Sequence, residues 1–457
     1  MRLHLFEIVN EPMTGTYRLA QENANQREDS IPPALSASRS SYASPLSESE
    51  DDGKSSRGTY LRRVDSIDLF RGSLLVVLIL GTAYLSSPMR SSLPIQGQNL
   101  ATWISRLEFN TAPSEWVSLY AGGIVRVRDL VLSGFLFVSG LSLFFWKRRR
   151  SRMDDHPVSR VGRILKRTFV LIVLGIFLQS LHSEYTRWVL TDALTIIGIS
   201  WFLTYILARG PKWFQLVMVA LLLTCYAVWF ESSAPVRYPD ELAAIPVNPD
   251  PENAWAYQAN VADLTDRIWM SRLPNQPDAE FRLIGRTSFV FIPATALMLF
   301  GYLCASILSD SSWSRWPKFI GLCGAAAALI LAGFGAHVYL GPAIEKLMSP
   351  AWVLLAAGYA LAWFAVCYLV CEVCRCSALV TPLRQMGRNS LLIALTSLSL
   401  TGWLGRELWK HLHPLAERLA GGTISSEFTL LCHMVMAVLA AMLIAEILDR
   451  QRIHIRL

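Results

Sequence analysis

The sequence has 457 residues, of which 53% are hydrophobic and only 17% charged, whereas an ordinary soluble domain carries about 25% charged residues. This composition, together with a mean hydropathy of +0.35, argues against a purely soluble protein. The formal net charge of +7 does not indicate nucleic-acid binding, because the basic residues lie beside apolar runs rather than on one polar domain. We therefore expect no nucleic-acid partner and a single polytopic membrane bundle, which a chain of this length can form.

The first 60 residues are polar and rich in Ser, Pro and mixed charge, as in the run Ser47-Glu-Ser-Glu-Asp-Asp. Such a composition predicts a disordered tail. Because the tail lacks the apolar core of a signal peptide, we expect the first apolar run downstream to act as an uncleaved insertion signal. The sequence thus predicts two parts, a disordered cytosolic tail over residues 1–60 and a transmembrane domain over residues 61–457.

Ten apolar segments follow the tail, and each is a candidate for a membrane helix, since about 20 residues cross the bilayer core. No backbone polar group can stay unpaired in lipid, so each span is expected to be α-helical. The sequence therefore predicts an all-α polytopic bundle of about ten spans in a lipid bilayer. The segments are residues 70–87, 130–146, 166–182, 191–208, 213–230, 287–308, 319–340, 351–373, 388–404 and 428–448.

Lys and Arg gather on one side of this bundle. The strongest cluster is Lys147-Arg-Arg-Arg-Ser-Arg, and in a ten-span order the other short basic loops fall on the same side. Because such loops stay in the cytosol, both termini are expected to be cytosolic. The opposite side receives the longer loops 88–128, 231–286 and 405–427. The membrane itself, bacterial inner, plasma or lysosomal, is left open.

Eight cysteines lie in or at the ends of the apolar segments, which excludes a disulfide framework. Cys371, Cys374 and Cys376 form a CxxCxC cluster that is compatible with zinc or palmitoylation, but no second Cys/His pair lies near it. His411 and His413 lack an adjacent carboxylate, and an interfacial amphipathic turn explains them better. We expect no metal site.

A charged motif, Asp65-Ser-Ile-Asp68-Leu-Phe-Arg71-Gly72, stands at the start of the first span. It places a carboxylate and a guanidinium three residues apart, on one face of a helix. Taken alone, the motif can also be an anchor for the helix end, with Arg71 reaching the interface.

This opening and four later motifs together resemble the transmembrane acyltransferase superfamily, of which heparan-alpha-glucosaminide N-acetyltransferase is the best-known type. All five stand in the family's order between residue 64 and about residue 400. The four later motifs are Arg128-Asp129-Leu-Val-Leu-Ser-Gly-Phe-Leu-Phe, with Ser133 where the family has Pro, the stretch from Arg163 to Gly198, Pro342-Ala-Ile-Glu-Lys346-Leu-Met-Ser-Pro350-Ala-Trp352, and Gly387-Arg-Asn389-Ser390.

The resemblance implies a membrane-embedded acyltransferase that takes an acetyl group from cytosolic acetyl-CoA and transfers it to a sugar amine or hydroxyl on the far side. This chemistry needs a base or a nucleophile, and a basic pocket for the CoA phosphates. The candidate CoA-binding residues are Arg71, Arg163, Lys166, Arg167, Arg388 and Asn389, and the candidate substrate-binding residues are Asp68, Trp116 and Lys346.

The chain departs from the family in the first outer loop, where the family's catalytic His stands in an H-x-x-W context. Here the corresponding stretch is Phe109-Asn-Thr-Ala-Pro-Ser-Glu-Trp116, and no His occurs between residues 5 and 155. His182 at the outer end of the third span is the foremost substitute, followed by His337 and His433. We take Asp129, which matches the family carboxylate, and His182 as the candidate catalytic residues.

Two other functions are compatible with the sequence. The chain could be a non-catalytic transporter or carrier of a small polar or carbohydrate solute, or a structural membrane subunit. Loop 231–286 interleaves acidic and aromatic residues, as a site for a sugar or a cationic amine would. The expected partners are the lipid bilayer, a carbohydrate acceptor and, as an open option, a second copy of the chain in a homodimer.

Overall fold

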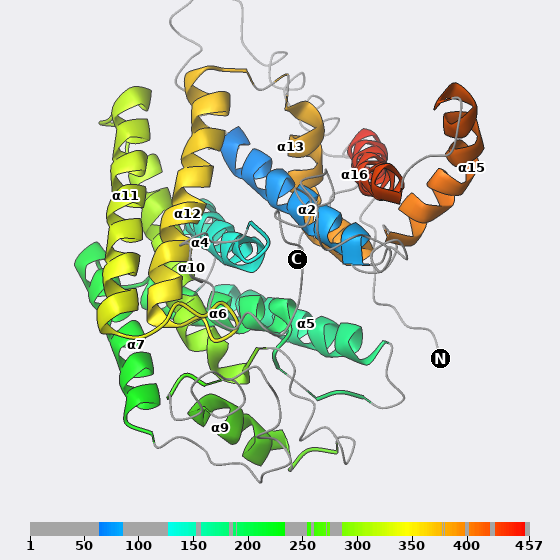
Figure 1. Cartoon of the computed structure of the whole chain (residues 1–457). Coiled ribbons are helices and arrows are strands. Elements are labelled where there is room, and N and C mark those ends of the chain that lie inside the picture. Colours follow the sequence, from blue (N-terminus) through cyan, green and yellow to red (C-terminus); the bar gives the residue numbers. More distant parts are fainter. Residues whose placement is uncertain are drawn as a thin grey trace, which may run out of the picture. The chain divides into compact units, whose positions relative to one another are not determined.

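The computed structural model describes residues 64–85, 127–151, 157–181, 186–188, 190–233, 254–256, 260–270, 272–274, 286–376, 378, 380–397, 402–420 and 426–452. The expected tail, residues 1–60, lies outside them. The described residues form helices and no strand (Figure 1). The helices are α2 (Asp65–Leu85), α4 (Leu130–Ser151), α5 (Pro157–Ser180), α6 (Ala193–Leu207), α7 (Lys212–Glu231), α9 (Val261–Met270), η3 (Ser288–Val290), α10 (Phe291–Leu308), α11 (Arg315–Tyr339), α12 (Pro350–Tyr368), η4 (Leu369–Val373), α13 (Thr381–Arg388), α14 (Ser390–Thr396), α15 (Gly402–Ala420) and α16 (Ser426–Arg450).

Seven helical segments of the described chain are long and apolar enough to cross a membrane. They are α2, α4, α7, η3 with α10, α11, α12 with η4, and α16. The apolar helix α6 has only 15 residues. The expected spans 166–182 and 388–404 coincide with α5 and with α13 and α14, which do not meet the same limits. The all-helical class and the multi-pass membrane character are therefore confirmed, whereas the count of ten spans stays a prediction.

Helices α4 and α10 cross at two glycines. A Cβ on Gly140 would lie 1.9 Å from the backbone oxygen of Met298, and a Cβ on Gly301 would lie 2.0 Å from that of Phe137. The two backbones are thus in direct contact. Small residues at helix crossings are typical of membrane proteins, where lipid is as apolar as a side chain and close packing drives association.

A second backbone contact joins two helices far apart in the sequence, because α2 lies beside α13 (Figure 1). A Cβ on Gly72 would lie 1.9 Å from the oxygen of Leu383, and one on Gly387 would lie 1.8 Å from the oxygen of Asp68. These glycines belong to the D-x-x-R-G and G-x-N-S motifs. Part of the motif pattern is therefore explained by packing rather than by chemistry.

Basic side chains cap the ends of the central helices. Lys147 Nζ donates a hydrogen bond of 2.7 Å to the Ala208 oxygen at the end of α6, and Arg148 donates one of 3.4 Å to the Ser309 oxygen at the end of α10. Cations at helix C-termini are stabilising, since the last carbonyls carry partial negative charge. We call this end, where α4, α6, α10 and α12 finish and α2 begins, the basic end.

Candidate active site

Between α11 and α12 the chain forms a largely buried turn, residues 341–349, which we call the buried turn. Ser349 Oγ donates to the Pro342 oxygen (2.7 Å) and accepts from the Ile344 N–H (2.9 Å), while the Tyr226 hydroxyl donates to the Leu347 oxygen (3.0 Å). Gly341 has φ +118°, and a Cβ there would lie 2.8 Å from Trp255 Nε1. Loops usually lie on the surface, because a buried loop needs partners for its backbone. This turn has several, so it can hold its polar side chains inside the bundle.

Glu345 of the buried turn forms an ion pair with Arg286, which stands two residues before η3. Two further carboxylates act electrostatically on Arg286, Asp129 before α4 and Asp192 before α6. Lys346 interacts with Glu345, Arg286 and Asp129. We call these five residues the Arg286 cluster. The structure thus brings the sequence candidates Asp129 and Lys346 together, and it adds Arg286, Glu345 and Asp192.

The two cations of the Arg286 cluster, Arg286 and Lys346, differ in how firmly each holds its proton. Burial works against the charged form of Arg286, but Glu345, Asp129 and Asp192 together raise its pKa above the ordinary value. The pKa of Lys346 is lowered, mainly by burial and also by Arg286, despite the opposing effect of Glu345 and Asp129. Arg286 is therefore a fixed cation, whereas Lys346 is the cation that loses its proton more readily than usual.

Four helix N-termini converge on this cluster. Asp129, Asp192, Arg286 and Glu345 stand within six residues before the first residues of α4, α6, α10 and α12, and α10 packs on each of the other three helices. They therefore run in the same direction. The first N–H groups of a helix carry partial positive charge and favour anions. A developing oxyanion at this place would be stabilised by Arg286 and by the helix ends.

The histidine candidates have different places. His337 Nδ1 accepts a hydrogen bond of 3.1 Å from the Ala343 N–H and so helps to fix the buried turn. His433 on α16 packs edge-to-face on Trp409 of α15, with ring centroids 6.1 Å apart. His182 and Trp116 lie outside the described residues, so their roles stay predictions.

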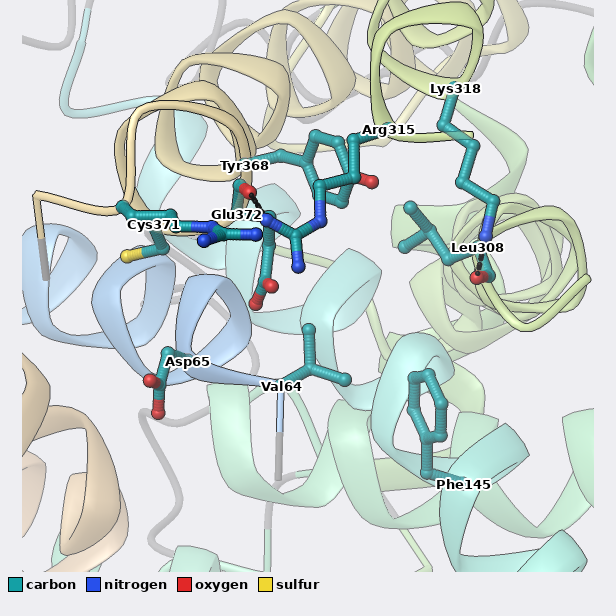
Figure 2. Close-up of a pocket in the computed structure, with 10 residues that line it drawn as sticks. Val64, Asp65, Phe145, Leu308, Arg315, Lys318, Tyr368, Cys371 and Glu372 are labelled. Atoms are coloured by element: carbon teal, nitrogen blue, oxygen red, sulfur yellow. Dashed lines mark hydrogen bonds between the residues drawn. The ribbon is translucent and has the colours of Figure 1, made fainter. Parts of the chain in front are cut away.

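A cavity of about 600 Å³ lies at the basic end (Figure 2). Arg315 and Lys318 border it from α11, and Arg315 donates a hydrogen bond of 2.9 Å to the backbone oxygen of Glu372 in η4. The π-helical turn η4 lies directly on this cavity, and such turns are frequent at functional sites. None of the sequence candidates within the described residues lines the cavity. Its lining residues are Val64, Asp65, Phe145, Leu308, Arg315, Lys318, Tyr368, Cys371, Glu372 and Arg375.

Two CoA-binding candidates lie together inside the bundle near this end. Arg71 donates to Ser142 Oγ on α4 and stands 3.7 Å from Asp68. Arg167 interacts electrostatically with Arg71, and its guanidinium lies 4.2 Å from the ring centroid of Trp201. Arg71 of α2 and Arg167 of α5 repel each other, and a bound anion would relieve this repulsion.

The other CoA-binding candidates have separate environments. Arg388 pairs with Asp449 of α16 at 3.0 Å, which ties α13 to the C-terminal helix. Asn389 is 2% exposed, and neither atom of its amide has a partner among the described residues. Lys166 is exposed, and Arg163 donates 2.9 Å to Ser159 of its own helix. Arg163 and Lys166 therefore do not lie in the cavity of Figure 2.

The interior between the two ends is partly polar. Helix α10, with 18 residues, separates the ends by about 27 Å. The hydroxyls of Ser133, Thr195 and Thr204 and the indole N–H of Trp201 are buried there, and none has a hydrogen-bond partner among the described residues. Buried polar groups without partners cost free energy, so these positions are suited to a polar chain bound between the helices.

A buried carboxylate beside the site predicts a pH-dependent stability. Asp266 of α9 is 1% exposed, and its Oδ2 accepts a hydrogen bond of 2.7 Å from the Ser288 N–H of η3. Burial raises the pKa of Asp266 to about 6, against 3.8 for a free Asp. The neutral form is thus favoured in the fold, so the contribution of Asp266 to stability is full below pH 3.8 and is lost as pH rises through 6. In the wild type, the free energy of unfolding should therefore fall by about 3 kcal/mol between acidic and neutral pH because of Asp266, and we expect this fall to be absent in Asp266→Asn.

The measurement is thermal unfolding of the detergent-solubilised protein across this pH range. The control is Asp310→Asn, since Asp310 is exposed and its pKa is lowered by hydrogen bonds from Ser312, so its effect has the opposite sign. Equal pH slopes for the wild type and Asp266→Asn would contradict the assignment.

Within the described residues no group of His, Cys, Asp and Glu is arranged to hold a metal ion.

The sequence matches a known family over a region that contains most of the Arg286 cluster. The family described as "Heparan-alpha-glucosaminide N-acetyltransferase, catalytic" matches residues 106–341, slightly more than half of the 457 residues. The match includes Asp129, Asp192 and Arg286 and ends just before the Glu345 and Lys346 part of the buried turn. No curated protein matches the chain significantly.

Proposed function

Because the chain belongs to the heparan-alpha-glucosaminide N-acetyltransferase family, we propose that it transfers an acetyl group from acetyl-CoA to a sugar amine or hydroxyl. The donor enters at the basic end, which is the cytosolic end, and the acceptor binds at the Arg286 cluster on the opposite side. The observation that carries this proposal is the pair of charged sites at the two ends of the same four parallel helices. An acetyl group passed between compartments requires such a pair.

The cavity at the basic end suits the nucleotide part of CoA. Arg315, Lys318 and Arg375 supply the cations that phosphate groups require. Tyr368 and Phe145 offer aromatic surface for the adenine ring. The pantetheine arm, which carries amides, then extends between the helices, where the unpaired hydroxyls and the pair Arg71 and Arg167 can bind it.

The Arg286 cluster suits the reacting groups. Asp129 accepts a hydrogen bond from the acceptor amine or hydroxyl and orients it, while Arg286 and the helix N-termini stabilise the oxyanion of the tetrahedral intermediate. Asp68 and Trp116 stay candidates for contacts with the substrates. His182 stays the second candidate catalytic side chain, and its replacement by Ala tests that role directly.

The test is release of free CoA, detected as thiol, from acetyl-CoA mixed with the purified protein and glucosamine. We expect turnover, with the acetylated sugar found by mass spectrometry. Binding of acetyl-CoA and of sugars without turnover across a panel of acceptors would instead favour a carrier. Absence of both acetyl-CoA binding and sugar binding would favour the structural subunit.

The donor site makes a separate prediction. Arg315→Ala and Arg375→Ala should each raise KM for acetyl-CoA by about 10-fold, because a hydrogen bond to a charged group contributes about 1.5–3 kcal/mol. The kcat value should change little, since neither side chain touches the reacting atoms. Arg450→Ala is the matched control, because Arg450 is an exposed arginine paired with Glu446 outside the cavity. An unchanged KM in both cavity variants would place the donor elsewhere.

A further inference from the structure

Lys346 occupies an unusual position for a lysine. It is half-buried in the turn before α12, and charged groups from three segments act on it. These groups are Glu345 of the same turn, Arg286 before α10, and Arg128 and Asp129 before α4. Lysine side chains normally extend into water. The buried turn instead holds this one at the place where the acceptor is proposed to bind.

The other groups of the cluster are poorly suited to accept a proton. Arg286 stays protonated throughout the accessible pH range, and Glu345 is held by its ion pair with Arg286. Asp129 is a carboxylate, and a carboxylate is a much weaker base than a neutral amine. Among the described histidines, His337 accepts a hydrogen bond from the buried turn through Nδ1, and His433 lies against Trp409 in the packing of α15 on α16, away from the turn that carries Lys346.

The surroundings make Lys346 easier to deprotonate than a free lysine. Burial penalises the ammonium form most, Glu345 and Asp129 oppose this effect, and the guanidinium groups of Arg286 and Arg128 repel the ammonium, so the net result is a lowered pKa of Lys346. The converging helix N-termini add positive potential at the same place. A general base works best when its pKa lies near the operating pH, and these features shift a lysine in that direction.

We propose that Lys346 Nζ is the general base of the acetyl transfer, which rests on the function proposed above. The acceptor nitrogen or oxygen attacks the thioester carbonyl carbon, the new C–N or C–O bond forms, and its proton moves to Lys346 Nζ. When the intermediate collapses, the C–S bond breaks and the electron pair goes to sulfur. The Lys346 ammonium then returns the proton, so that CoA leaves as a thiol and the amine is neutral again.

Two variants separate a base from a cation that only binds substrate. Lys346→Arg keeps the positive charge but has no proton-accepting form at accessible pH, and Lys346→Met removes both properties. General base catalysis contributes about 100- to 10,000-fold, so kcat should fall at least about 100-fold in both variants. The acetyl-CoA dissociation constant, measured by calorimetry, should stay within about twofold of the wild type. Lys410→Arg on α15 is the control, because Lys410 is exposed and pairs with Glu407.

The pH dependence of the wild type gives a readout that does not need the variants to fold. We expect kcat/KM to rise with pH through the pKa of Lys346 and then level off, with two amine acceptors of different basicity giving the same inflection. A flat profile, or near-wild-type kcat in Lys346→Arg, would overturn the role of Lys346 while leaving the acyltransferase itself intact. Failure of the wild type to turn over acetyl-CoA with any acceptor would reject the proposed function, and the base with it.

Discussion

Replacing Gly140 or Gly301 by alanine is expected to destabilise the protein by more than about 3 kcal/mol, at the upper end of the range for overpacked cores. The added Cβ would stand 1.9 Å or 2.0 Å from a backbone oxygen of the facing helix. A side-chain rotation cannot relieve this overlap, because both atoms in conflict are fixed to backbone. Helices α4 and α10 would have to separate, and the fully buried side chains along their contact, such as Leu136 and Leu297, would lose close packing.

Thermal unfolding in detergent and the yield of folded protein by size-exclusion chromatography measure this effect. Gly324→Ala is the matched control, since Gly324 lies in the membrane helix α11 and a Cβ there would meet nothing within 4 Å. Its unfolding temperature should not fall, because Ala is the better helix former. Unchanged stability of Gly140→Ala and Gly301→Ala would show that the two helices do not touch as described.

Much of the fold could be predicted from hydropathy, because lipid imposes helices on apolar runs of sufficient length. Five of the seven helical segments that are long and apolar enough to cross a membrane need no other signal than a long apolar run, and α2 and α4 were expected beside their charged motifs. The sequence could not decide α5, whose first half carries Arg160, Arg163, Lys166 and Arg167, or the segment that breaks between α13 and α14 at Asn389. In both segments polar residues interrupt the apolar run, so hydropathy alone does not determine how deep the segment lies in the membrane. That depth depends on the helices against which the segment packs.

The candidate site was predicted in part for a similar reason. Asp129 and Lys346 stand in motifs that can be recognised along the chain, and the structure places them in one cluster. Arg286 had no such signal, because a lone arginine before an apolar run looks like an ordinary flanking charge. Its ion pair with Glu345 joins segments 59 residues apart, and hydropathy says nothing of such pairing. Glu345 itself stands beside Lys346 in the motif, which is the signal that could have identified it.

The common direction of the four parallel helices α4, α6, α10 and α12 connects the two sites. Their N-termini meet the cationic and anionic groups of the Arg286 cluster, and their C-termini at the opposite end are capped by Lys147 and Arg148. The potential at the two ends therefore differs before any substrate binds. The basic side chains of the basic end offset the negative helix C-termini there, as the proposed binding of phosphate groups at that end requires. At the cluster end, Arg286 and the helix N-termini offset the three carboxylates, and they are the groups that would stabilise the oxyanion of the proposed reaction.

Breaking the Arg286 and Glu345 ion pair is expected to have the second largest effect. Glu345 is 8% exposed, so in Glu345→Gln the guanidinium of Arg286 loses its closest counter-charge in a largely buried place. Removing one partner of a buried pair typically costs about 3–5 kcal/mol, and because the Arg286 side chain is 30% exposed we expect about 2–4 kcal/mol here. We also expect kcat to fall at temperatures where Glu345→Gln is still folded, since the buried turn that carries Lys346 is held to the start of α10 by this pair.

A double-mutant cycle isolates the pair itself. Arg286→Gln and Glu345→Gln should each destabilise the protein, and the double variant should recover part of the loss, because it leaves no buried charge without a partner. The matched control is Arg450 with Glu446, an Arg–Glu pair whose side chains are 77% and 41% exposed. Exposed pairs contribute about 0–1 kcal/mol, so the control cycle should give little coupling. Equal coupling energies in the two cycles would mean that burial adds nothing at Arg286, and the cluster would then not be the preorganised site inferred from its charges.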